Sequence, residues 1–382
     1  MNFQSHDRVR LVIDGVFFQL NSTGIARVWS SILKRWAGQP FAKEILILNR
    51  GGTAPVFPNL RYRTIPTYTI GQGAADREML QSIVDEERGE LFASTYYTSV
   101  PRTKTLQIVY DMIPEVFGWD VTREPAWVEK HQAFRRADSF ICISDSTQND
   151  LLRFFPEIKP QAVTRVYLGI DAADFRPPSR DDLLQFLRKY SLNRPYFLMV
   201  GSGDGYKNGR MLLDALSLLP SNHGFEVVMV TRGHIPASFR ESLTNGTLKV
   251  LPLSDEELTI AYTGAVAFVC PSLYEGFGLP ILEAMSCNCP VISNNKASLP
   301  EVGGDAALYA TTVEELASAL CEVQKPEVQN YLVRAGNSRV PQFSWDKTAR
   351  EWWQVVCSLT DNDTVESEET FRQSIQLIND LI

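Results

Sequence analysis

The chain has 382 residues, 44% of them apolar, and a net charge of -8. Its length exceeds one ordinary domain and predicts two domains of roughly 150–200 residues each. The acidic balance argues against a nucleic-acid-binding protein, and no stretch approaches the ~20 apolar residues of a membrane span. The polar N-terminal residues also lack the apolar segment of a secretion signal.

In the first half of the chain, short apolar runs alternate with segments of helical periodicity, which is typical of parallel α/β folds. Ser146 and Asn149 offer cap chemistry near the start of one predicted helix. Strands are predicted at residues 9–14, 44–49, 105–109 and 139–143, and helices at 24–36, 76–87, 125–136 and 146–155.

A cluster of glycine, proline and asparagine at residues 168–194 indicates a linker with a short helix at 181–190. The alternation then restarts, so we expect two doubly wound domains that face each other across a cleft. A tryptophan-rich helix at 343–359 should pack on a domain surface. In the second half, strands are predicted at residues 196–200, 225–230, 248–251, 265–270 and 290–293, with a helix at 208–219.

The most informative segment is residues 270–285, where an apolar run leads into a glycine-bearing turn and a predicted helix. Pro280 suits the first position of that helix, where its missing N–H costs nothing. Gly276 and Gly278 let the backbone approach a ligand, and amides at a helix start can hold an anion. Glu275 and Glu283 flank this turn. The segment therefore predicts a phosphorylated sugar ligand, with amides for its phosphates and carboxylates for its hydroxyls.

A second glycine-rich turn, at residues 201–208, follows a predicted strand and contains Lys207. Such a turn suits a phosphate cradle, and Lys207 would add positive charge at the helix start. The spacing is not that of a P-loop, which argues against a nucleoside triphosphatase. A tight turn with a solvated lysine is the alternative. Because both turns follow strands of one domain, we expect them to face the same cleft.

These residues carry a resemblance that extends over residues 9–358. Residues 271–285 are similar to the signature of the retaining, nucleotide-sugar-dependent glycosyltransferases of family four, mannosyltransferases among them, in which seven residues separate two glutamates. The resemblance implies the GT-B fold, with two Rossmann-like domains. Weaker matches are Asp14, Thr23–Ile25, Ile143–Ser144, Thr147, Gly169–Asp171, Phe175, Lys207–Asn208, Pro300–Glu301 and Gly304–Ala307.

The resemblance also implies a domain organisation. Residues 1–170 would form an N-terminal acceptor domain, and residues 171–342 a C-terminal domain for the nucleotide-sugar donor. Residues 343–382 would supply a helix that crosses back to the first domain, followed by an acidic tail.

The matching residues acquire expected roles from the family. Glu275 would bind donor-sugar hydroxyls near the reaction centre, Glu283 would hold the ribose hydroxyls, and Lys207 would neutralise the departing diphosphate. Gly24 would let the backbone approach the donor phosphates. The other expected donor-binding residues are Ser144, Ser202, Arg232, Leu253, Gly276, Phe277, Gly278 and Leu279.

The sequence departs from the family pattern at two places. Many relatives have a histidine where this chain has Tyr110, so Tyr110 or Asp111 would supply the contact to the donor sugar, or the sugar differs. Tyr110 as a buried aromatic at a strand end is the alternative. Ser202 stands where some relatives use a second cation. Arg232 would provide that charge from the neighbouring turn, unless it is an exposed surface arginine.

The implied reaction is transfer of a hexose from a nucleoside-diphosphate sugar to an acceptor hydroxyl, with retained anomeric configuration, no tightly bound cofactor and no metal. GDP-mannose is the first expected donor and a UDP-sugar the second, in glycan, polysaccharide or glycolipid biosynthesis. The acceptor stays open among a glycan, a lipid-linked oligosaccharide and a small metabolite. A nucleotide-sugar epimerase and a catalytically silent binding protein remain as alternatives.

We expect a cytoplasmic protein without a nucleic-acid partner, and the sequence does not decide its oligomeric state. The helix around His131 has one basic side. This side would be exposed to solvent, or it would make a peripheral contact with the inner face of a membrane. The four histidines and six cysteines lack metal spacing, and the cysteines are typical of buried thiols in a reducing cytosol. Asp361 and Asp363 match an acid pair that binds metal in another glycosyltransferase fold. Because they lie in a polar tail, we expect them to be solvated and not to bind a metal.

Overall fold

The computed structural model describes residues 8–20, 24–71, 73–203, 205–220, 224–231, 239 and 247–360. Arg232 and the tail at 361–382, both named above, lie outside the described residues. The chain divides into two compact units, which are treated separately below. The first consists of Met1–Gln107, Val128–Ser139 and Ala349–Ile382, and the second of Ile108–Trp127 and Phe140–Thr348. The boundaries expected at 170/171 and 342/343 stay predictions.

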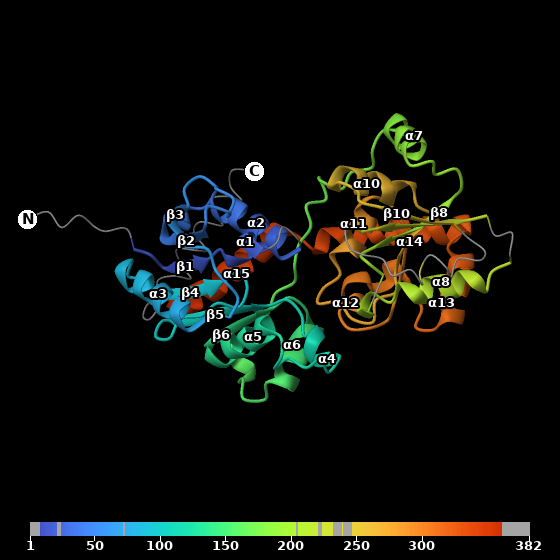
Figure 1. The fold of residues 1–382 in the computed structure, drawn as a ribbon. Helices are drawn as coiled ribbons and strands as arrows, with labels where there is room; N and C mark the ends of the chain where they lie inside the picture. Colours follow the sequence, from blue (N-terminus) through green and yellow to red (C-terminus); the bar gives the residue numbers. More distant parts are fainter. Residues whose placement is uncertain are drawn as a thin grey trace, which may run out of the picture. The chain divides into compact units, whose positions relative to one another are not determined.

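One sheet has seven strands in the order β3-β2-β1-β4-β5-β6-β7, and Figure 1 labels β1 to β6. Strand β1 (Leu11–Asp14) is buried throughout and pairs in parallel with both β2 and β4. Burial on both faces is expected of a parallel strand covered by helices. The other strands are β2 (Ile45–Arg50), β3 (Arg61–Ile65), β4 (Leu91–Ser94), β5 (Lys104–Val109), β6 (Ser139–Cys142) and β7 (Val163–Arg165). The helices among them are α1 (Val16–Leu20), α2 (Gly24–Trp36), α3 (Gly73–Glu86), α4 (Ile113–Val116), α5 (Pro125–Arg136) and α6 (Asp145–Phe154).

The other sheet has six strands in the order β10-β9-β8-β11-β12-β13. The strand order reverses between β8 and β11, and in such sheets ligands bind at the carboxyl ends of the strands beside this switch point. The strands are β8 (Tyr196–Val200), β9 (Glu226–Val230), β10 (Thr247–Leu251), β11 (Ala267–Cys270), β12 (Val291–Ser293) and β13 (Ala307–Tyr309). The helices are α7 (Arg180–Lys189), α8 (Gly209–Ser217), α10 (Asp255–Gly264), α11 (Leu279–Ser286), α12 (Leu299–Gly303), α13 (Val313–Glu322) and α14 (Pro326–Arg339).

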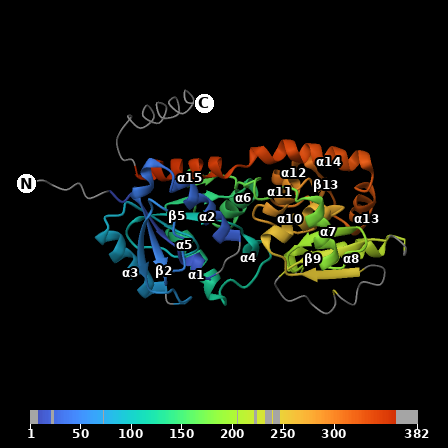
Figure 2. The same cartoon turned by 90° about the horizontal axis from the view of Figure 1, so that it is seen from above.

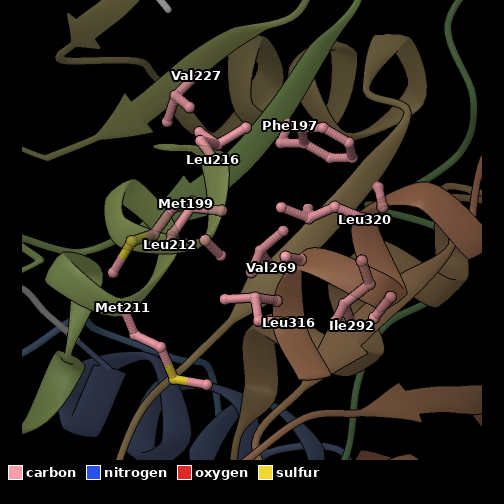
Figure 3. Close-up of a cluster of buried hydrophobic side chains, with 14 of the residues drawn as sticks. Phe197, Met199, Met211, Leu212, Leu216, Val227, Val269, Ile292, Leu316 and Leu320 are labelled. Atoms are coloured by element: carbon pink, nitrogen blue, oxygen red, sulfur yellow. The ribbon is translucent and has the colours of Figure 1, made fainter. Parts of the chain in front are cut away.

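The core of the second unit lies between the six-stranded sheet and helices α8 and α13. Figure 3 shows Leu212 and Leu216 of α8 facing Leu316 and Leu320 of α13, with strand side chains such as Phe197 beside them. In Figure 1, α10 and α11 cover the opposite face of this sheet. The helices on both faces bury the central strands.

Figure 2 shows helix α15 (Trp345–Thr360) along the first unit, where its residues Trp352 and Trp353 pack. Trp352 lies edge-on to Trp29 of α2 with 5.2 Å between ring centroids, and Trp353 stacks on Phe41 at 3.7 Å. The indole N–H of Trp36 donates to the Ala349 carbonyl over 2.9 Å. These contacts agree with the prediction that the tryptophans of this helix serve packing.

A buried ion network joins three elements of the first unit. Both oxygens of Asp14, at the end of β1, accept hydrogen bonds from Arg50 at the end of β2, over 2.9 and 2.7 Å. Arg50 also binds both oxygens of Asp76 on α3, over 2.6 and 2.8 Å. Burial raises the pKa of the Asp14 carboxyl, although the Arg50 guanidinium and the Thr98 hydroxyl act in the other direction.

Most predicted elements are present, within about two residues at their ends, and three have the predicted bounds: α2, α5 and β8. The apolar run at 265–270 is shorter as a strand, because Ala265 is the C-cap of α10. Several elements were not predicted, among them the four-residue β4, the polar β3, and helices α10, α13 and α14. Short strands and polar strands carry too few apolar side chains to show a period.

Among the residues that the structure describes, no helix is both long enough and apolar enough to cross a membrane. The same residues contain no group of three or more histidine, cysteine, aspartate or glutamate side chains placed to hold a metal ion.

Candidate donor site

Two loops meet at the carboxyl edge of the six-stranded sheet, on either side of its switch point. Lys207 follows β8 and Glu275 follows β11, and these strands are neighbours in the sheet. The Lys207 ammonium donates to Glu275 Oε1 over 2.7 Å, and the Ser272 hydroxyl donates to the same oxygen over 2.7 Å. The structure therefore brings together the lysine and the first glutamate that the sequence singled out.

The electrostatics of this pair keep Lys207 positively charged. Burial of the lysine opposes its charge, but the Glu275 carboxylate beside it outweighs this effect, so the pKa of Lys207 is raised. Both side chains are partly exposed, at 23% for Lys207 and 15% for Glu275, so a ligand can reach them. A stable cation next to a carboxylate suits a ligand that combines phosphates with hydroxyl groups.

Hydrogen bonds to backbone carbonyls join the two loops directly. The Leu273 amide donates to the Tyr206 carbonyl over 2.7 Å, and the Asn208 side-chain amide donates to the Pro271 carbonyl over 3.1 Å. Asn208 has a left-handed backbone with φ 51°, which asparagine tolerates better than most residues. Gly203 also has a positive φ, of 75°, and accepts from the Gly209 amide at the start of α8.

The backbone of the Glu275 loop is held closely from several sides. The Ser298 hydroxyl lies 2.8 Å from each of the Glu275 and Phe277 carbonyl oxygens. The Thr147 hydroxyl, on α6, donates to the Gly276 carbonyl over 3.1 Å. A Cβ atom at Gly276 would lie 1.7 Å from the Tyr110 carbonyl oxygen, so only glycine fits there.

The loop ends in helix α11, whose N-cap is Gly278 with φ 107°. Pro280 occupies the second helical position, not the first as predicted, because Leu279 already belongs to the helix. The missing N–H of proline is harmless at either position, since the first turn has no intrahelical acceptors for its amides. The start of α11 thus faces the carboxyl edge of the sheet, as a site for anions requires.

Glu283 lies on α11 as predicted, one turn into the helix, and is only 4% exposed. Its Oε2 atom accepts a hydrogen bond from the Tyr262 hydroxyl of α10 over 3.1 Å. Glu283 is therefore not a carboxylate on the exposed surface of the helix. Sequence patterns did not point to Tyr262, because α10 itself was not predicted.

Tyr110 and Asp111 follow β5 and lie next to the Glu275 loop. The Tyr110 side chain is buried, and its backbone carbonyl lies against Gly276. Asp111 Oδ1 accepts from the Ile113 amide over 3.1 Å. The burial agrees with the alternative of a strand-end aromatic, and a direct contact of either residue with a donor sugar stays a prediction.

Ser144 has a structural role at the start of α6. Its hydroxyl oxygen caps the helix by accepting from the Thr147 amide over 3.0 Å. The next two amides, of Asp145 and Ser146, donate to the Glu301 carboxylate over 2.7 Å each. Glu301 therefore already occupies this helix start. The sequence indicated Glu301 only as one of the weaker matches to the family, without a role.

The remaining predicted residues lie in other parts of the chain. Ser202 is half-buried in the glycine-rich turn, and Leu253 is buried between β10 and α10. Gly24 is the exposed first residue of α2 in the first unit. A Cβ atom there would meet nothing within 4 Å, so packing does not require glycine.

Comparisons with known proteins show which families and proteins the chain resembles. Residues 194–325 match the model of the family described as glycosyl transferases group 1. The O-antigen chain mannosyltransferase B of Escherichia coli is 32% identical over 228 residues, which is 56% of this chain and 59% of that protein. The serotype-specific mannosyltransferase WbdA of Escherichia coli is 26% identical over 317 residues, 75% of this chain and 38% of that protein.

A solved glycosyltransferase from Rickettsia africae superposes with a TM-score of 0.70 at 15% identity, covering 92% of this chain and 98% of that one. The predicted GT-B fold class, with two parallel α/β sheets, is confirmed. Residues 194–325 are thus similar to a glycosyltransferase group 1 domain, and the chain is similar to mannosyltransferases. The chain spans 59% and 38% of the length of the two Escherichia coli proteins.

Proposed function

We propose that this protein is a retaining glycosyltransferase, which moves a hexose from a nucleoside-diphosphate sugar to an acceptor hydroxyl. The observation that carries the proposal is the convergence of Lys207 and Ser272 on Glu275 Oε1 at the switch point of the six-stranded sheet. The group 1 family match covers both loops of this site. The whole chain's activity, its donor and its acceptor are parts of the proposal.

In the proposed reaction, the bond between the sugar and the diphosphate breaks, and negative charge grows on the leaving diphosphate. Lys207 and the amides at the start of α11 would stabilise that charge, in the role that a metal ion has in other transferases. Glu275 would orient the sugar hydroxyls, and Glu283 the ribose hydroxyls. The acceptor proton would pass to the leaving phosphate on the same face of the sugar, which retains its anomeric configuration.

The donor that we propose first is GDP-mannose, because the names of both Escherichia coli relatives specify mannosyl transfer. A UDP-sugar is the second candidate. The proposed acceptor is a glycan hydroxyl in surface polysaccharide synthesis, which follows from the O-antigen relative. A cytoplasmic location and a peripheral membrane contact are expectations from the sequence and belong to the same proposal.

Calorimetry against GDP, UDP, ADP and thymidine diphosphate, with and without EDTA, tests the donor class. We expect tight binding of one nucleotide, GDP first, that EDTA does not change. Glu275→Ala should reduce turnover, and Glu283→Ala should weaken nucleotide binding. Glu327→Ala, which removes an exposed carboxylate from α14 of the same unit, is the control and should do neither.

Turnover with the donor so identified tests the reaction class. Proton NMR of the product should show the anomeric configuration of the donor. Inversion of that configuration, or a covalent glycosyl-enzyme trapped on a carboxylate, would contradict the proposed mechanism. Nucleotide-sugar binding without transfer to any acceptor would favour a silent binding protein, and isomerisation of the free donor would favour an epimerase.

A further inference from the structure

Tyr262 is a buried residue next to the candidate donor site. Its side chain contacts the carboxylate of Glu283, for which a role in ribose binding is proposed above. Tyr262 lies on α10, is fully buried, and donates its hydroxyl to Glu283 Oε2 over 3.1 Å. Its ring is fixed by an edge-on contact with Phe268 of β11, with 5.4 Å between centroids. The tyrosine therefore presents its hydroxyl to Glu283 from a position that packing determines.

The surroundings of Tyr262 make this hydroxyl a donor under all ordinary conditions. Burial and the neighbouring Glu283 carboxylate raise the pKa of Tyr262 well above its usual value, so the phenol keeps its proton. Burial likewise raises the pKa of the Cys287 thiol nearby to about 12, so the thiol stays neutral. Glu283 is itself buried, and a hydrogen bond to a buried carboxylate is stronger than the same bond in water.

A buried carboxylate that binds two ribose hydroxyls must hold one orientation. Carboxylates are acceptors with several lone-pair directions, and rotation about the last side-chain bond of glutamate is only weakly restricted. A fixed donor on one oxygen removes that freedom.

We propose that Tyr262 is a positioning residue, which orients Glu283 so that the site distinguishes a nucleotide with ribose hydroxyls from one without them. The inference rests on the proposed function, in which Glu283 binds the ribose. Tyr262 itself would not touch the nucleotide. Its contribution should appear only in the part of the binding affinity that depends on the ribose hydroxyls.

The test measures dissociation constants for GDP and 2′,3′-dideoxy-GDP, and for UDP and its dideoxy analogue, by calorimetry. The quantity of interest in each pair is the dissociation constant of the dideoxy analogue divided by that of the nucleotide with ribose hydroxyls. Tyr262→Phe should reduce this ratio by about tenfold, the effect of one hydrogen bond to a charged group. Affinity for the dideoxy analogue should change little, because that ligand does not use the oriented carboxylate.

Tyr196→Phe is a matched control. Tyr196 lies on β8, is 1% exposed, and donates its hydroxyl to the Ala261 carbonyl over 2.7 Å, so its loss also removes one buried hydrogen bond in this unit. Both variants should lower the melting temperature, but only Tyr262→Phe should change the ratio. Glu283→Ala sets the limit, since it should abolish the discrimination altogether.

Two different failures can be told apart. If Glu283→Ala abolishes the discrimination and Tyr262→Phe leaves it unchanged, the inference is overturned and the proposed function stands. The inference also fails if Tyr196→Phe lowers the ratio as much as Tyr262→Phe does. If no nucleotide binds, or if Glu283→Ala leaves the ratio unchanged, the donor-site assignment fails, and the inference fails with it.

Discussion

At the scale of single residues, the site depends on which groups share one oxygen. Lys207 and Ser272 both donate to Glu275 Oε1, so the charge of the lysine and the orientation of the carboxylate are coupled. A ligand phosphate would draw the lysine toward itself, whereas Ser272 would keep its contact with the glutamate. Lys207 is therefore the residue whose removal should affect the chemical step most.

Lys207→Met should lower kcat about 10²–10³-fold, because a preorganised charge at the leaving group is lost. The apolar side chain has similar length, so the loop should keep its shape. Lys189→Met is the matched control: Lys189 is exposed and pairs with Glu257 over 2.6 Å away from the two loops. Steady-state kinetics of donor turnover would check this, and an unchanged kcat in Lys207→Met would contradict the proposed role.

Gly276→Ala should displace the Glu275 loop, because the new Cβ atom would lie 1.7 Å from the Tyr110 carbonyl oxygen. Overpacking of this kind typically costs about 1–3 kcal/mol, and we expect activity to fall at least tenfold. Gly38→Ala is the comparison, since a Cβ atom there has its nearest neighbour at 3.6 Å. Kinetics and thermal unfolding of both variants decide the matter, and equal behaviour of the two would refute the steric argument.

At the scale of elements, helix α15 belongs to the first unit through aromatic packing. Trp352 and Trp353 are buried against α2 and Phe41, while Gln354, on the same helix, is exposed. Trp352→Ala should reduce the unfolding free energy by about 3–5 kcal/mol, and Gln354→Ala by less than about 0.5 kcal/mol. Denaturant unfolding followed by fluorescence measures both, and a similar small effect for the two would show that the helix is not needed for stability.

The network of Asp14, Arg50 and Asp76 connects β1, β2 and α3. Arg50→Met would leave the Asp14 carboxylate buried without its cation, at a cost of about 3–5 kcal/mol near neutral pH. Arg61→Met, at a partly exposed pair with Glu87, should cost less than about 1 kcal/mol.

The deficit of Arg50→Met should depend on pH in a defined direction. Burial already raises the pKa of Asp14, and loss of the guanidinium, which acts in the other direction, raises it further. The folded variant then binds more protons than the unfolded chain, so the deficit shrinks as the pH falls from 7 toward 5. Denaturant midpoints across this range test it, and a deficit that grows on acidification would contradict the burial argument.

At the scale of the whole molecule, nucleotide binding should stabilise the fold without a metal. A nucleoside diphosphate at about 100 times its dissociation constant adds about 2.7 kcal/mol to the stability of the unit that binds it. The melting temperature should therefore rise by the same amount with EDTA and with added Mg²⁺. A rise that appears only with Mg²⁺ would show that a metal accompanies the diphosphate, and would displace Lys207 from its proposed role.

Much of the site could be predicted because its residues lie in one continuous segment. Glu275, Gly276, Gly278 and Glu283 are within nine positions of one another, and their local geometry follows from a strand, a turn and a helix. Tyr262, Ser298 and Glu301 could not be found in this way. Tyr262 and Ser298 form hydrogen bonds to residues more than twenty positions away in sequence. Glu301 accepts from the start of helix α6, which only folding brings close to it.

The alternation of apolar runs and helical periods by itself determined the α/β class and most of the elements, because burial on both faces of a parallel strand leaves a readable pattern. The motif by itself also predicted the helix that carries the second glutamate, although that helix begins at Leu279 and not at Pro280. Only the tertiary structure decided that Lys207 and Ser272 share one carboxylate oxygen, that Glu283 is buried, and that Tyr262 binds it. The physical reason is that strand order and helix packing are set by non-local contacts, which leave no period in the sequence.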